Sequence, residues 1–301
     1  MIVAYKEMFF VGNKAKLKSE KLFNEEENSH LLYQKDGYLA RIILNRPAKN
    51  NAFSLPMIKK WAEALEDAQN DPNIRVIIVT GRGKAFCAGG DTEAMLAGKG
   101  FVSHDDHGES WGDKAIDRKR ALTDHIHKIA LILDAMDKPV ICGINGVAVG
   151  AGLDMALMCD IRITAADAQF STGYVNAGLV PGDGGAYYIP RLVGLSKALE
   201  ILWTGDFFSA TEAEKMGLVN KVVPTAELEQ ATFDFAQKIA NSPPVSVQMI
   251  KRAVNSTLHN TDLRTSLDLI SSHMAIVTEM SDHQEGLKAL KEKRKPVFTG
   301  R

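Results

Sequence analysis

The sequence predicts an α/β fold, because segments typical of buried strands alternate with segments typical of helices. Residues 38–45, 74–81, 138–146 and 159–165 are short apolar runs rich in β-branched side chains, as in the strands of a buried sheet. Helical patterns stand between them, and that order requires crossover connections between parallel strands. From residue 228 onward the pattern is almost wholly helical. We therefore expect an α/β body followed by a helical C-terminal region.

The clearest single helix is predicted over residues 54–71. Ser54 is a favourable N-cap, and Pro56 suits the first turn of a helix. Apolar side chains then recur at helical spacing from Met57 to Ala68. These signals together predict a helix that buries one face.

The sequence predicts the start of a second helix at residue 209. Ser209 and Glu212 form the pattern of a capping box, and Gly217 marks the end of that helix. Before it, a long helix is expected to end near Met136.

The composition is that of an ordinary globular protein: 301 residues, 45 % hydrophobic, 24 % charged, with a net charge of -1. A chain of this length buries about 75 % of its unfolded surface, enough for one large core and a small appendage. The near-neutral charge argues against nucleic acid or an anionic membrane as the main partner. We expect an N-terminal extension over residues 1–28, an α/β core over 29–225 and a helical region over 226–301.

Two further features bear on the compartment. No apolar run approaches the ~20 residues that span a bilayer, and the N-terminus places its apolar patch before its lysines, the reverse of a secretory signal. Cys87, Cys142 and Cys159 have neither metal-ligand spacing nor the pattern of a disulfide framework. We expect a cytoplasmic protein that has no membrane segment.

A small-residue turn, "GAGLD" at residues 150–154, precedes a short helix. A phosphate-binding loop would close with Lys-Ser/Thr, and a dinucleotide fingerprint would carry a third glycine where Met155 stands, so both nucleotide interpretations fail. Two interpretations of similar weight are left: free amide groups at a helix N-terminus that face a substrate oxygen, or close packing of the helix on a strand.

A second turn of the same kind lies in "GKAFCAGGDTEAM", residues 83–95. It offers free N–H groups from Ala88 to Gly90, while Asp91 suits a simple helix cap. Two such turns in one α/β domain favour an oxyanion hole, in which two N–H donors converge on one carbonyl oxygen.

Six segments, in order, resemble the enoyl-CoA hydratase/isomerase (crotonase) superfamily from about residue 31 to residue 301. They are "LNRPAKNNAF", "GKAFCAGGD", "KPVICGINGVAVGAGLDMALMCDIRI", "AQFSTGYVNAGLVPGDGGAYYIPRLVG", "SATEAEKMGLVNKVVP" and "EGLKALKEKRKPVF". The resemblance implies a spiral of ββα units with a helical C-terminal region that packs in trimers or hexamers. It also implies an acyl-CoA substrate, with coenzyme A as part of that substrate and no tightly bound cofactor.

The resemblance implies roles for particular residues. The backbone amides of Gly90 and Ala151 match the pair that polarises the thioester carbonyl. The walls that hold coenzyme A match Lys49, Ala52, Ala88 and Asp91, and basic residues that reach a neighbouring subunit's CoA phosphates match Lys293 and Lys295.

The acid/base residues depart from the family pattern. The two glutamates of the best-known hydratases match Asp154 and Tyr174. Aspartate withdraws the carboxylate by about one methylene, and a phenol of pKa about 10 is a poor base at neutral pH. Two arrangements are open: Asp154 acts alone with Tyr174 orienting substrate or water, or Asp183 serves as the second carboxylate. Asp183 also fits a turn-stabilising role in "PGDGG".

The resemblance favours an enoyl-CoA hydratase with Asp154 as the principal acid/base. The alternatives are an enoyl-CoA isomerase, an acyl-CoA hydrolase or a cyclic dienoyl-CoA hydratase on the same fold, and, from another class, a homologue that binds acyl-CoA without turnover. No metal site is expected: His104 to His107 form a polar loop without further ligands, and His125 and His127 do not share a helix face.

Overall fold

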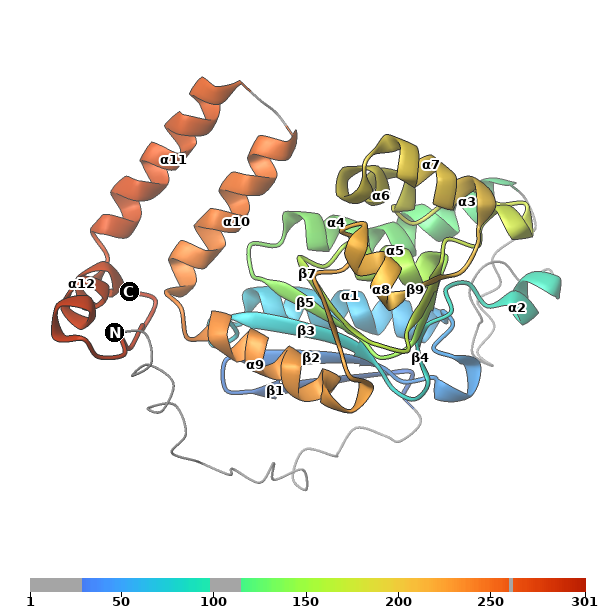
Figure 1. Ribbon diagram of the computed structural model, residues 1–301, viewed down its shortest axis with the longest axis horizontal. Helices are drawn as coiled ribbons and strands as arrows, with labels where there is room; N and C mark the ends of the chain where they lie inside the picture. The colour runs from blue at the N-terminus through green and yellow to red at the C-terminus, as the bar shows by residue number, and fades with distance from the viewer. Residues whose placement is uncertain (1–28, 98–114, 260–261) are drawn as a thin grey trace.

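The computed structural model describes residues 29–97, 115–259 and 262–301 (Figure 1). The larger of two sheets has six strands in the order β1-β2-β3-β5-β7-β10; β1 is antiparallel to β2, and the other neighbours are parallel. Its strands are β1 (Leu31–Asp36), β2 (Leu39–Leu44), β3 (Val76–Gly81), β5 (Val140–Ile144), β7 (Ile161–Ala165) and β10 (Lys221–Val223). The four predicted strands are β2, β3, β5 and β7.

A smaller sheet has four short strands in the order β4-β6-β8-β9. They are β4 (Ala85–Cys87), β6 (Val147–Val149), β8 (Gln169–Ser171) and β9 (Phe208–Ser209). Each of β3, β5 and β7 is followed along the chain by a strand of this smaller sheet and then by helical structure. The body is therefore a repeat of ββα units, and the parallel strands β4, β6 and β8 end at one edge.

Helices surround the sheets (Figure 1). Helix α1 (Leu55–Asn70) starts as predicted, with the Ser54 hydroxyl accepting a hydrogen bond from the Met57 amide at 3.4 Å, and it buries Trp61 completely. Helix α8 (Ala210–Lys215) has the predicted capping box of Ser209 and Glu212. The other helices of the body are α2 (Thr92–Leu96), α3 (Ala115–Ala121), α4 (His127–Ala135), α5 (Ala151–Leu157), α6 (Gly185–Val193) and α7 (Leu195–Thr204).

The predicted long helix is divided. A π-helical turn, Leu122–Ile126, joins α3 to α4, and the helix ends with Met136 as its C-cap, close to the predicted end. Both Leu122 and Ile126 face the cavity described below. Such turns insert one extra residue into a helix and occur frequently at functional sites.

The C-terminal part is helical, as predicted. Helix α9 (Leu228–Ala240) packs against β3, β5 and β7 of the larger sheet. The helices α10 (Pro244–His259), α11 (Leu263–Thr278) and α12 (Ser281–Glu292) project to one side of the body, to which Lys251 of α10 is joined by a 2.7 Å ion pair with Asp160 (Figure 1). Within the described ranges, no helix combines the length and the apolar character that crossing a bilayer requires.

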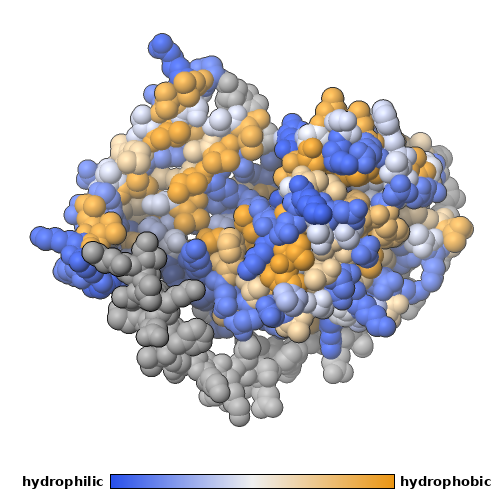
Figure 2. All heavy atoms as spheres, viewed as in Figure 1, coloured by the Kyte–Doolittle hydropathy of each residue, from blue (hydrophilic) through white to orange (hydrophobic). Residues whose placement is uncertain are grey.

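Hydrophobic side chains lie exposed on α10 and α11, visible as orange atoms at the upper left of Figure 2. On α10 they recur every four residues, so they share one face of the helix. The exposed residues are Ile250, Val254 and Leu258 on α10, and Leu263, Leu267, Ile270, Met274 and Ile276 on α11. An apolar surface of this kind is typical of a protein–protein interface.

Candidate active site

The ends of the short parallel strands bring the predicted site residues together. Gly90 follows β4, Ala151 follows β6 and Tyr174 follows β8. Because β4 pairs with β6 and β6 with β8 in parallel, their carboxyl ends meet at one edge of the smaller sheet. Residues that are far apart in the chain thus come to line one hollow.

Glycine allows the first two turns to touch. Gly89 has a φ of +79°, and a Cβ there would lie 2.6 Å from the Val149 carbonyl oxygen and 3.1 Å from the Ala151 nitrogen. A Cβ at Gly152 would lie 2.2 Å from the Cys87 carbonyl oxygen. The two turns are therefore in direct backbone contact, which no larger residue at these positions permits. This contact explains the small-residue pattern of both turns.

The close approach places the Gly90 and Ala151 amides on the same cavity. Ala151 is the first residue of α5, where the N–H groups have no partner within the helix. Neither amide donates a hydrogen bond to another group in the described part of the chain. Two free N–H donors beside one cavity are what stabilisation of an oxyanion requires.

The cavity has a volume of about 230 Å³ and is mostly apolar. Its side chains come from the first turn, the π-helical turn, α5 and the segment after β8. The lining residues are Phe53, Ala88, Gly90, Thr92, Met95, Leu122, Ile126, Val149, Gly150, Ala151, Gly173, Tyr174, Ala177, Leu179, Val180, Gly182 and Asp183. Among the described residues, Asp183 is the one carboxyl group on this wall.

Asp154 is not among the residues that line the cavity. It sits in the first turn of α5 and is fully buried. Its Oδ2 accepts a hydrogen bond from the Tyr174 hydroxyl at 2.6 Å and another from the Gly185 amide at 2.8 Å. Burial raises the pKa of Asp154 to about 7, although these hydrogen bonds favour its ionised form. Asp154 thus meets the cavity through Tyr174.

Tyr174 and Asp183 form the polar end of the cavity. The Tyr174 hydroxyl lies 3.3 Å from Asp183 Oδ2, so it contacts both carboxyl groups. Burial raises the pKa of Asp183 to about 6. Burial, followed by the two neighbouring carboxyl groups, raises the pKa of Tyr174 above its usual range, which keeps the phenol protonated. The Oδ1 atoms of Asp154 and Asp183 are buried without a hydrogen-bond partner in the described structure.

His127, considered from the sequence only as a metal ligand and set aside, lies beside the site. Its Nε2 donates a hydrogen bond of 2.6 Å to the carbonyl oxygen of Gly182, the residue before Asp183. The charge of His127 also lowers the pKa of Asp183, against the larger effect of burial. The π-helical turn that precedes His127 aims it at this loop, and a single sequence carries no clear signal for such a turn.

The residues predicted to hold coenzyme A divide into two groups. Ala88 lines the cavity, and Ala52 is buried. The exposed Lys49 forms a 2.5 Å ion pair with Glu93 on α2. Asp91 caps α2 by accepting from the Ala94 amide at 3.1 Å, so its alternative role as a helix cap is confirmed.

Lys293 and Lys295 lie after α12, at the opposite end of the subunit from α2 and β4 (Figure 1). Within one subunit the structure therefore does not bring them to the cavity. His104 to His107 lie outside the described residues.

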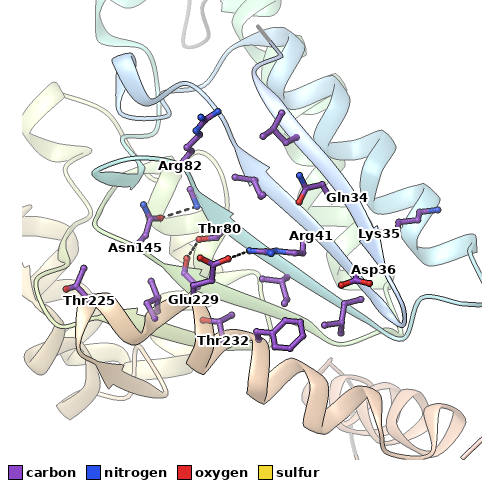
Figure 3. A pocket seen from close by; sticks show the side chains of 18 residues that line it. Gln34, Lys35, Asp36, Arg41, Thr80, Arg82, Asn145, Thr225, Glu229 and Thr232 are labelled. Atoms are coloured by element: carbon purple, nitrogen blue, oxygen red, sulfur yellow. Dashed lines mark hydrogen bonds and ion pairs between the residues drawn. The ribbon is translucent and has the colours of Figure 1, made fainter. Parts of the chain in front are cut away.

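A larger cavity of about 780 Å³ lies elsewhere, between β1, β2, β3 and α9 (Figure 3). Its wall includes Arg41, whose Nη2 forms a 2.8 Å ion pair with Glu229. Of the residues predicted for the site, none lines this cavity. The smaller cavity is the candidate active site because it alone of the two holds the free amides and the buried acids.

Known proteins resemble this chain along most of its length. Residues 34–301 match the family described as enoyl-CoA hydratase/isomerase. A crotonyl-CoA hydratase from Syntrophomonas wolfei is 33 % identical over 270 residues, covering 89 % of this chain and 97 % of the relative. A 1,2-epoxyphenylacetyl-CoA isomerase from Escherichia coli is 34 % identical over 260 residues, covering 86 % of this chain and 94 % of the relative.

A solved structure agrees with the sequence relatives. The crystal structure of an enoyl-CoA hydratase from Bacillus anthracis matches with a TM-score of 0.81 at 32 % identity, covering 90 % of this chain and 100 % of that chain. The predicted crotonase-like fold, with its ββα spiral and helical C-terminal region, is thereby confirmed. The chain belongs to the enoyl-CoA hydratase/isomerase family.

Proposed function

We propose that this protein is an enoyl-CoA hydratase, which adds water across the double bond of a 2-enoyl-CoA. One observation carries the proposal: two buried carboxyl groups, Asp183 and Asp154, share one phenol beside the cavity. Burial raises their pKa values to about 6 and about 7, so both groups can exchange protons near neutral pH. Hydration needs a base for the attacking water and an acid for the α-carbon.

The thioester oxygen is proposed to accept hydrogen bonds from the Gly90 and Ala151 amides, which would form the oxyanion hole. Negative charge develops on this oxygen when a nucleophile adds to the β-carbon. Preorganised donors in an apolar cavity stabilise that charge, and losing one such donor typically costs roughly 10²–10³ in rate. The free state of both amides supports this role.

The proton steps follow from the position of Asp183 on the cavity wall. Its carboxylate takes a proton from the attacking water while the water oxygen bonds to the β-carbon and the π electrons move to the thioester oxygen. The carbonyl then re-forms, and the Asp183 carboxyl group returns a proton to the α-carbon. The net change is addition of one water molecule, and the enzyme regains its starting state.

The remainder of the substrate is proposed to lie along the first turn. Lys49, Ala52, Ala88 and Asp91 would border the coenzyme A moiety there. We further propose a trimer or hexamer in which Lys293 and Lys295 of one subunit reach the CoA phosphates of its neighbour, since both lysines lie far from their own cavity. The exposed apolar faces of α10 and α11 support such an assembly.

Double-bond isomerisation is the second candidate. Asp183 is the single carboxyl group that the described residues place on the cavity wall. Moving a double bond requires only that this carboxylate take a proton from one carbon and return it to another, with no water to activate. The match to a family described as enoyl-CoA hydratase/isomerase is consistent with this candidate.

The test is turnover of crotonyl-CoA, followed by loss of its conjugated enoyl absorbance, beside turnover of a 3-enoyl-CoA. We expect hydration by the wild type and a loss of at least ~10²-fold in Asp183→Asn. Asp234→Asn, at an exposed position on α9, is the matched control and should keep full activity. Turnover of the 3-enoyl-CoA alone would establish the isomerase, and tight binding without turnover of either would establish a binding protein.

A further inference from the structure

The Tyr174 hydroxyl lies between two carboxyl groups and has one proton to donate. Its oxygen is 2.6 Å from Asp154 Oδ2 and 3.3 Å from Asp183 Oδ2. The shorter distance is that of a phenol donating to a carboxylate. The second contact is then a hydrogen bond when Asp183 is protonated and donates to the phenol oxygen. The geometry thus fits one chain of hydrogen bonds, from Asp183 through Tyr174 to Asp154.

When Asp183 is ionised, the same hydroxyl has a different use. By rotating its O–H bond, Tyr174 can donate to the Asp183 carboxylate in place of the Asp154 carboxylate. No heavy atom has to leave its position for this exchange. The phenol therefore stabilises the protonated form of Asp183 in one orientation and its ionised form in the other.

The two carboxyl groups have unequal access to a substrate. Asp183 lines the cavity, whereas Asp154 is fully buried and held by the Gly185 amide at the start of α6. Tyr174 is the described side chain that hydrogen-bonds both Asp154 and the cavity-lining Asp183. The phenol therefore offers a hydrogen-bonded route between Asp154 and the acid on the cavity.

Among the described residues, two other titratable groups lie near Asp183. His127 faces the same loop from α4 and lowers the pKa of Asp183. Cys87, at the end of β4, is fully buried, and burial raises its pKa to about 12, so it stays a neutral thiol. The hydrogen bond with the Tyr174 hydroxyl can therefore shift the protonation of Asp183.

We propose that Asp154 sets the protonation state of Asp183 through the Tyr174 hydroxyl and does not touch the substrate. Asp154 is then a positioning residue, and the three groups act as one proton-sharing unit. The unit lets Asp183 act as a base towards water and as an acid towards the α-carbon within one turnover. This inference rests on the proposed function.

The test compares pH profiles of kcat/KM for three variants. Asp154→Asn replaces a charged acceptor with a weaker neutral one, so Tyr174 donates more readily to the Asp183 carboxylate and the acidic limb should move down by about one pH unit. Tyr174→Phe removes the donor, so the acidic limb should move up by about one pH unit. Adding Asp154→Asn to the Tyr174→Phe variant should cause no further shift, because the connection is already broken.

Tyr33→Phe is the matched control. It removes a tyrosine–aspartate hydrogen bond of 2.7 Å, to Asp67, on the surface beside β1 and α1. Its pH profile should equal that of the wild type. Shifts of the same sign in Asp154→Asn and Tyr174→Phe, or additive shifts in the double variant, would overturn the proposal.

A second readout separates this inference from the proposed function. The Asp183 carboxyl can be titrated directly by ¹³C NMR of the free protein, in which no substrate turns over. The same opposite shifts are expected there. Suppose that the wild type fails to hydrate any enoyl-CoA, but the Asp183 pKa measured by NMR shifts in opposite directions in the two variants. The proposed reaction is then wrong, and the proton-sharing unit is supported. If the protein is active but the titrations do not shift, the proton-sharing unit falls.

Discussion

Replacing Gly185 with alanine would push a methyl group into the Asp154 carboxyl group. A Cβ built at Gly185 lies 2.5 Å from Asp154 Oδ1 and 3.0 Å from its Cγ. Ordinary contact begins at 3.4 Å, so the carboxyl group has to retreat by about 1 Å. Asp154 is short and fully buried, and its side chain cannot turn into solvent to make room.

The retreat of the carboxyl group strains both hydrogen bonds of Asp154 Oδ2, from the Gly185 amide at 2.8 Å and from the Tyr174 hydroxyl at 2.6 Å. A hydrogen bond to a charged group is worth about 1.5–3 kcal/mol. Losing one of the two should lower the free energy of unfolding by that amount and the apparent Tm by roughly 2–5 °C. Misplacement near 1 Å typically costs ~10²-fold in rate, and kcat should fall accordingly.

Gly286→Ala is the control for a glycine-to-alanine change. A Cβ there would lie 3.8 Å from the nearest atom, on the Phe298 ring, so it fits within α12. Alanine in a helix interior should raise the free energy of unfolding by about 0.5–1 kcal/mol and leave kcat unchanged. Thermal unfolding by circular dichroism and steady-state hydration of crotonyl-CoA measure both effects. A Gly185→Ala protein with wild-type Tm and kcat would refute the confinement of Asp154.

Three other predictions concern charge, substrate and assembly. Burial raises the pKa values of Asp154 and Asp183 in the folded protein, so their contribution to stability is present below pH about 4 and lost as the pH rises through 6 and 7. Urea unfolding at about pH 5 and pH 8 should therefore show a smaller loss of stability with rising pH in Asp154→Asn than in the wild type; an equal loss would contradict the raised pKa. A CoA thioether without the carbonyl oxygen should bind roughly tenfold more weakly than the matching thioester by calorimetry, because the Gly90 and Ala151 amides lose their acceptor; equal affinity would remove these amides from the site. Val254→Lys on α10 should lower the molecular mass in sedimentation velocity, and Leu195→Lys on α7 should not, whereas an unchanged assembly in Val254→Lys would place the interface elsewhere.

The sequence predicted those parts of the fold whose signals are local. Helix α1 has a cap, a suitable first turn and a continuous apolar face within 17 residues, from Ser54 to Asn70. Strand β3 is an uninterrupted β-branched run. The three-residue strands β4, β6 and β8 carry too little pattern to be recognised, because their pairing partners lie far away in the chain. Yet their parallel pairing is what gathers the site.

The site was predicted in part for the same reason. The two small-residue turns are visible in the sequence because each must accept a close backbone approach, as Gly89 and Gly152 do. Which acid faces the substrate depends on the packing of α6 against α5, which no local pattern records. The hydrogen bond from His127 to the Gly182 carbonyl depends in turn on a π-helical turn in another helix.

At the two positions where this chain departs from the family pattern, the side chain of Asp154 is shorter than glutamate and that of Tyr174 is longer. Aspartate is one methylene shorter than glutamate, so its carboxyl group stays buried beneath the wall. Tyrosine is longer, and its hydroxyl occupies the space in front of that carboxyl group, 2.6 Å away. A second ionised carboxylate in this place would add repulsion in a buried setting, whereas the neutral phenol adds a donor. Another carboxyl group, that of Asp183, lies nine residues further along the chain, with its Oδ2 3.3 Å from the same hydroxyl. A departure from the family pattern at one position therefore has to be interpreted together with the residues that it contacts. Asp154, Tyr174 and Asp183 have to be substituted in combination, because the effects of the single substitutions on activity should be strongly non-additive.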